Sequence, residues 1–72
     1  MSRLPQLKPE QVVRALLGLG YFTREGARHT IIHNGREILT TVPRGSKTVK
    51  PGTLHGILKD VGLDPDEFKK LL

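Results

Sequence analysis

The stretch from Tyr21 to Val42 most constrains the fold, because it divides into three β-strand patterns separated by two turns. Aromatic and β-branched residues predict strands at 21–25, 29–33 and 36–42. Gly26-Ala27 is expected to form the first turn. Asn34-Gly35 is a strong hairpin signal and predicts a two-residue type I′ turn, which needs positive φ at both central positions. Strands joined in this way predict an antiparallel sheet.

A helical pattern precedes this stretch. Pro9 and Glu10 suit the first turn of a helix, because proline has the right φ and an acid favours the positive end of the dipole. Gly18 and Gly20 are expected to end the helix, with Gly20 as the left-handed cap. Its apolar stripe is expected to consist of Val12, Val13, Leu16, Leu17 and Leu19. The segment before it, 1–7, is expected to be a frayed leader.

Two further helical patterns follow the strands. Pro51-Gly52-Thr53 opens the first of them and Gly62 is its expected cap. Asp64 is expected to cap a short last helix, with Glu67 completing a capping-box-like pair. The expected apolar positions are Leu54, Ile57, Leu58 and Val61 in the first helix and Phe68, Leu71 and Leu72 in the second.

The order of these elements is α-β-β-β-α with a short extra C-terminal helix. Helices on one face of an antiparallel sheet make an α+β two-layer sandwich, whose other sheet face is open to water or to a partner. Seventy-two residues are expected to form a single domain, 1–72. Alternation along 29–33 puts His29, Ile31 and His33 on one face and the residues between them on the other. An isoleucine lies on each face, so the pattern leaves open which face the helices cover.

Composition narrows the classes of function. The chain has no cysteine, which excludes disulfides, thiolate chemistry and zinc-finger spacings, and favours a cytoplasmic location. Its start lacks the apolar run of a signal peptide, and no run is long enough to span a membrane. No Gly-rich phosphate loop precedes a helix, so neither a nucleotide nor any other small-molecule cofactor is expected.

Positive charge gathers in the middle of the chain. The net charge is +5, and the segment 24–50 carries six basic residues against two acids. Such a patch suits a polyanion such as nucleic acid, although a solubilising surface explains it equally well. The six basic residues are Arg24, Arg28, Arg36, Arg44, Lys47 and Lys50.

His29 is the candidate for chemistry, because a glycine turn places it at the start of a strand. The structural alternative is a histidine at a strand edge, hydrogen-bonded to the turn. His33 is roughly 13 Å further along at the rise of a strand, too far to share a proton or a metal with it, and is expected to flank the Asn-Gly turn. His55 is expected on the exposed side of its helix. No metal is predicted, since no histidines have ligand spacing and the acids at 64–67 are explained by capping.

Taken together, the motifs resemble the HicA toxins, small mRNA interferases that are paired with a HicB antitoxin. The motifs run in order through Gly20-Tyr21, Arg24, Gly26 to Ile32, Val42-Pro43, the basic loop from Arg44 to Lys50, and Pro51-Gly52-Thr53-Leu54 through Ile57-Leu58 to Gly62-Leu63. The last of these is the most specific. The resemblance implies a fold similar to the double-stranded-RNA-binding domain, which agrees with the element order.

The resemblance also implies a function: a metal-independent endoribonuclease that cleaves mRNA and inhibits translation, acts in the cytoplasm and is neutralised by a HicB-like antitoxin. Imidazole suits the proton transfers of RNA cleavage because it titrates near operating pH, and cations meet the charge that develops on the phosphate. His29 would be the base or the acid. The expected RNA-binding residues are Arg24, Arg28, Arg44, Lys47 and Lys50.

The chain departs from the family pattern at two positions. Family members usually carry the motif Gly-Ser-His or Gly-Gly-His. Here Arg28 occupies the histidine position, and the histidine follows one residue later at His29. Either the turn holds one extra residue and His29 takes the role, which we favour, or the catalytic histidine is absent and Arg28 stands in its place. Gly45 also stands near where family members often carry a histidine. The alternative functions are a non-catalytic RNA-binding module of the same fold and a protein-interaction subunit.

Overall fold

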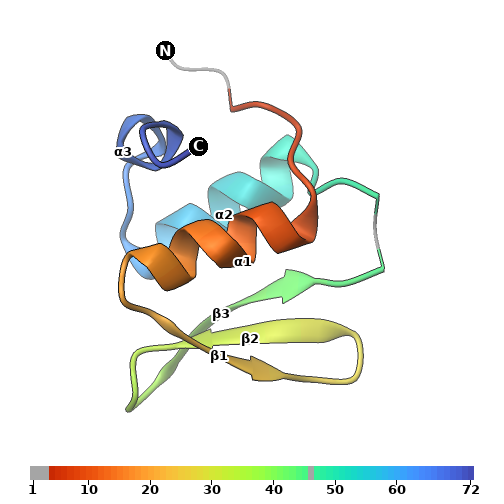
Figure 1. Cartoon of the computed structure of the whole chain (residues 1–72), viewed down its shortest axis with the longest axis vertical. Coiled ribbons are helices and arrows are strands. Elements are labelled where there is room, and N and C mark those ends of the chain that lie inside the picture. The colour runs from red at the N-terminus through yellow and green to blue at the C-terminus, as the bar shows by residue number, and fades with distance from the viewer. Residues whose placement is uncertain (1–3, 46) are drawn as a thin grey trace.

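Two helices cover one face of a three-stranded antiparallel sheet (Figure 1). The structure is a computed structural model that describes residues 4–45 and 47–72. The elements follow the predicted order: α1 (Pro9–Gly18), β1 (Phe22–Glu25), β2 (His29–His33), β3 (Ile38–Pro43), α2 (Pro51–Val61) and α3 (Pro65–Lys69). The fold is therefore α+β, with the α-β-β-β-α arrangement followed by a short helix. α3 lies on the side of the helices away from the sheet (Figure 1).

The strands lie in the order β1-β2-β3, so β2 is central. Thr30 and Ile32 of β2 are buried, whereas His29 is exposed. This settles the choice that alternation left open: Thr30 and Ile32 face the helices, and the face that carries His29, Ile31 and His33 is uncovered. The buried Thr40 of β3 also faces the helices, and its hydroxyl donates to Asp60 Oδ2 of α2 at 2.9 Å, which ties the two layers together.

The helix caps formed largely as their sequences predict. Gly20 and Gly62 both adopt positive φ, of 97° and 74°, at the ends of α1 and α2.

The α2 stripe is confirmed, with Leu54, Ile57 and Leu58 buried. The stripes of the other two helices are narrower than predicted. Exposed leucines lie at the ends of both, namely Leu17 near the end of α1 and Leu19 at its C-cap, and Leu71 and Leu72 after α3.

The N-terminal segment is not the frayed leader that its sequence suggested. Leu4 and Leu7 are buried in the core, and the Leu7 carbonyl accepts a hydrogen bond from the Val49 amide at 2.7 Å. Residues 1–3 of that predicted leader lie outside the described residues. The segment is held because its two leucines bury apolar surface and its backbone bridges to the loop before α2.

The second hairpin turn also differs from its prediction. No described residue other than glycine has positive φ, so Asn34 does not adopt the type I′ conformation, and β3 begins at Ile38 rather than Arg36. Instead, Asn34 Oδ1 accepts hydrogen bonds from the amides of Arg36 and Glu37, both at 2.8 Å. The asparagine therefore closes a longer loop with its side chain, and only Gly35, at φ 91°, is left-handed.

Among the described residues no helix is both long and apolar enough to cross a membrane.

Candidate active site

A tight turn between β1 and β2 presents His29. The Gly26 amide donates to the His29 carbonyl at 2.8 Å, which leaves Ala27 and Arg28 at the tip and makes His29 the first residue of β2. Glycine is required at position 26, because a Cβ there would lie 2.8 Å from the His29 carbonyl oxygen. The turn therefore depends on a close approach of two backbone segments, and it places an exposed imidazole at one end of the open sheet face.

Arg24 lies on the same open face as His29. It stands opposite Ile31, which follows His29 by two positions along β2. Diagonal neighbours of this kind in an antiparallel sheet have their side chains roughly 7–8 Å apart, which long side chains can span. Arg24 and His29 can thus contact one phosphate together. Arg28, at the tip of the turn, is exposed.

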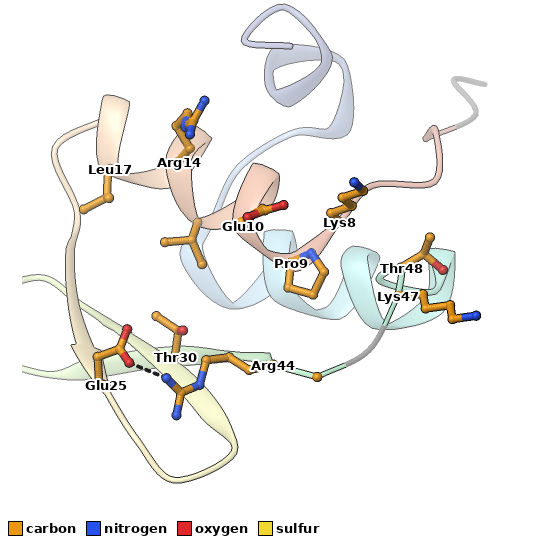
Figure 2. Close-up of a pocket in the computed structure, with 12 residues that line it drawn as sticks. Lys8, Pro9, Glu10, Arg14, Leu17, Glu25, Thr30, Arg44, Lys47 and Thr48 are labelled. Carbon is orange, nitrogen blue, oxygen red and sulfur yellow. Dashed lines mark hydrogen bonds and ion pairs between the residues drawn. The ribbon is translucent and has the colours of Figure 1, made fainter.

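Arg44 lies on the other side of the sheet, where it contacts the protein itself. Its guanidinium pairs with the Glu25 carboxylate and donates to the Gly26 carbonyl, and it also donates to the Ala27 carbonyl at 3.1 Å. Figure 2 shows this guanidinium turned toward Glu25 below α1. Arg44 was expected to bind RNA, but its donors are directed to the β1–β2 turn.

A groove of about 870 Å³ separates α1 from β2 and the loop after β3 (Figure 2). Lys47 lines this groove, and its side chain points away from Arg44. Lys50, at the N-terminus of α2, is exposed and is not part of the lining. The other lining residues are Lys8, Pro9, Glu10, Val13, Arg14, Leu17, Glu25, Thr30, Gly45 and Thr48, together with Arg44.

The predicted site residues are therefore not gathered in one place. Arg24 and His29 share the open face, Arg28 is at the tip of the turn, and Arg44 and Lys47 line the groove on the helix side. Lys8 and Arg14 add two cations to the groove, and neither was among the predicted site residues. Lys8 is the N-cap of α1 and Arg14 lies within the helix, outside its apolar stripe. Their polar positions in the helical pattern were the only sequence feature that could have indicated them.

Two of the remaining polar candidates, His33 and Asp64, have structural roles. His33 Nδ1 accepts from the Gly35 amide at 3.1 Å, and its ring stacks on Phe22 with centroids 5.6 Å apart, so it flanks the turn as predicted. His55 is exposed on α2, also as predicted. Asp64 caps α3 by accepting from the Asp66 amide at 3.0 Å. In residues 4–45 and 47–72, no three His, Cys, Asp or Glu side chains are grouped so that they could hold a metal ion.

Comparison with known proteins identifies a family for the chain. A search of curated proteins returned no match. A family model described as the HicA toxin of bacterial toxin-antitoxin matches residues 9–63 of the 72. The match runs from the start of α1 past the end of α2, and so includes both hairpin turns, His29 and Arg44. The chain therefore belongs to the HicA family, the toxins of bacterial toxin–antitoxin pairs.

Proposed function

We propose that this toxin is a metal-independent endoribonuclease that cleaves mRNA, with His29 transferring the proton of the reacting 2′-hydroxyl. The observation that carries the proposal is the placement of His29, which is exposed at the start of β2 on the uncovered sheet face beside Arg24. Membership of a toxin family favours a damaging activity over simple binding.

The chemistry needs a base and cations, which this face supplies, and one water molecule, whose hydroxide takes the proton back from His29 at the end. His29 takes the proton from a 2′-hydroxyl, and the freed oxygen attacks the adjacent phosphorus. The bond from phosphorus to the 5′-oxygen then breaks, and that oxygen takes a proton from water. The products are a 2′,3′-cyclic phosphate and a 5′-hydroxyl.

In this proposal two arginines stabilise the charge on the phosphate during the attack. Arg24 lies diagonally across the strands from His29, and Arg28 precedes His29 in the chain. A guanidinium suits this role because its planar set of donors matches the oxygens of a phosphate. In the order of family motifs Arg28 takes the usual histidine position, directly before His29 in the chain.

A single assay separates this proposal from its rivals. A labelled mixed RNA is incubated with the purified chain in the presence of a chelator, alongside His29→Ala and the matched control His55→Ala, which removes a histidine on α2. We expect cleavage by the parent and by His55→Ala, and none by His29→Ala. Equal cleavage by all three proteins would overturn the role of His29.

The same samples decide between the other functions if the parent does not cleave. Binding of the RNA that weakens as salt rises would then favour a non-catalytic RNA-binding module. Absence of both cleavage and binding would favour a protein-interaction subunit.

We also propose that the partner is a HicB-like antitoxin that covers His29 and the basic residues around it. A toxin of this family has a cognate antitoxin, and the uncovered sheet face is the surface that must be blocked to stop cleavage. Expression of the toxin alone should arrest growth, and co-expression of the neighbouring gene product should restore it. Purified partner that binds the toxin without slowing RNA cleavage would contradict this placement.

A further inference from the structure

Three consecutive carbonyl groups of the β1–β2 turn accept hydrogen bonds from one residue, Arg44. Its guanidinium donates to the carbonyls of Gly26 and Ala27, the latter at 3.1 Å. Its backbone amide donates to the carbonyl of Arg28 at 2.9 Å. A single residue just beyond the end of β3 therefore supplies the hydrogen-bond donors for the carbonyls of this turn.

Two backbone hydrogen bonds fix the peptide planes on both sides of His29, and the Arg44 guanidinium holds the residues of the turn that precede them, Gly26 and Ala27. A peptide unit is planar, so a hydrogen bond to the Arg28 carbonyl also fixes the plane that ends at the His29 nitrogen. On the other side, the bond from the Gly26 amide to the His29 carbonyl fixes the plane that leaves His29. With both planes held, the direction in which the imidazole leaves the backbone is also held.

The ion pair with Glu25 adds to the contacts that hold Arg44 on the turn, but it contributes less than the carbonyl hydrogen bonds. The Glu25 side chain is 79% exposed and that of Arg44 is 37% exposed, and ion pairs in such settings contribute little because water screens them. The carbonyl contacts are the more specific part, since they use the fixed geometry of a guanidinium, which a lysine does not have.

We propose that Arg44 is a positioning residue, which holds the β1–β2 turn so that His29 meets the substrate in the reactive orientation, and that it is not a ligand for RNA phosphate. This inference rests on the proposed ribonuclease function of His29.

The variant Arg44→Lys separates the two roles. Lysine keeps the positive charge and is itself a good phosphate ligand, but it lacks the rigid planar fork of donors with which the guanidinium reaches the two carbonyls and Glu25 together. Arg36→Lys is the matched control, because Arg36 is an exposed arginine in the other hairpin turn. For each protein we would measure the single-turnover rate of RNA cleavage in chelator, the Kd for RNA, and the ¹⁵N backbone order parameters of residues 27–29.

We expect Arg44→Lys to lower the cleavage rate on the order of 100-fold, the typical cost of a displaced reacting group. The Kd should change by about twofold or less, since the charge is retained. The order parameters of 27–29 should fall from roughly 0.85 toward 0.6, the range of a flexible backbone. Arg36→Lys should match the parent in all three measurements.

Other outcomes overturn the inference. A parental rate in Arg44→Lys would show that the turn does not need the guanidinium. A lower rate that is fully explained by weaker RNA binding would make Arg44 a phosphate ligand. Unchanged order parameters in 27–29 would also refute the positioning role.

The order parameters keep this inference distinct from the ribonuclease proposal, because they require no activity. If the parent does not cleave RNA but Arg44→Lys lowers the order parameters of 27–29, the proposed ribonuclease function fails. The inference that Arg44 holds the turn is then still supported. A second variant, Glu25→Gln, tests the ion pair alone, and we expect it to lower the cleavage rate by less than Arg44→Lys. An equal or larger loss in Glu25→Gln would show that the carboxylate, and not the carbonyl contacts, holds the turn.

Discussion

The two hairpin turns of the sheet take their hydrogen bonds from different parts of the chain. The β2–β3 turn closes on itself, because Asn34 Oδ1 accepts from the amides of Arg36 and Glu37 within the same loop. The β1–β2 turn has its own bond between Gly26 and His29, but the carbonyls of 26–28 accept from Arg44, which is 16 to 18 residues further along the chain. The self-contained turn lies at the end of β2 that carries His33, and the externally held turn is the one that presents His29.

The difference shows how a surface site can depend on the core. Arg44 opens the loop that leads to α2, and that loop is anchored where the Val49 amide bonds to the Leu7 carbonyl. Val49 and Leu7 are both buried. Packing of the N-terminal segment is thus linked to the position of His29, whereas the β2–β3 turn has no such link.

The largest effect is expected at the anchor of the loop. Leu7→Ala removes most of a side chain that is 6% exposed, and such changes cost about 2–5 kcal/mol of the free energy of unfolding. Urea unfolding measures this cost, and Leu17→Ala, at a leucine that is 48% exposed, is the control with a smaller expected loss. In the folded variant, amide hydrogen exchange should quicken at 26–28 and stay unchanged at 34–37. Equal quickening in both turns would contradict the link.

A matched pair of glycine substitutions compares the turns directly. Gly26→Ala places a Cβ 2.8 Å from the His29 carbonyl oxygen, which must move, so we expect the cleavage rate to fall by about tenfold or more. Gly35→Ala strains a residue at φ 91° and should cost about 1–2 kcal/mol of stability without changing the rate of the folded protein. The comparison fails if Gly35→Ala lowers the rate as much as Gly26→Ala does.

The smallest effect is expected at Asn34. Asn34→Ala removes the side-chain acceptor of two hydrogen bonds in an exposed loop, and we expect it to lower the free energy of unfolding by about 1 kcal/mol. Asn34→Asp keeps an acceptor oxygen and should retain most of that stability. Thermal unfolding of both variants provides the measurement, and the cleavage rate should be parental in each. A slower rate in Asn34→Ala would mean that the far turn also affects His29.

The sequence predicted features that depend on neighbouring residues. The helix stripe of Leu54, Ile57 and Leu58, the cap at Gly62 and the strand from His29 to His33 are all local patterns, and all are confirmed. Asn34-Gly35 predicted the hairpin correctly but its turn type wrongly, because the asparagine side chain offered the backbone a different set of hydrogen bonds.

Features that depend on distant residues were beyond the sequence patterns. Leu7 and Val49 are 42 positions apart, and the contact between Glu25 and Arg44 spans 19. Neither pairing leaves a periodic signal. For the same reason the sequence did not indicate that Arg44, after Pro43, lies on the helix side of the sheet and contacts the β1–β2 turn.

The central claim is that His29 removes a proton from the substrate's own 2′-hydroxyl without a metal. Its most direct test uses an RNA that the toxin cleaves at a known nucleotide, with the 2′-hydroxyl of that nucleotide replaced by hydrogen, in the presence of chelator. If His29 acts in this way, this strand still binds but stays intact at that position, while the unmodified strand is cut to leave a 2′,3′-cyclic phosphate. Cleavage of both strands at the same rate would contradict it, because the nucleophile would then not be the group whose proton His29 takes.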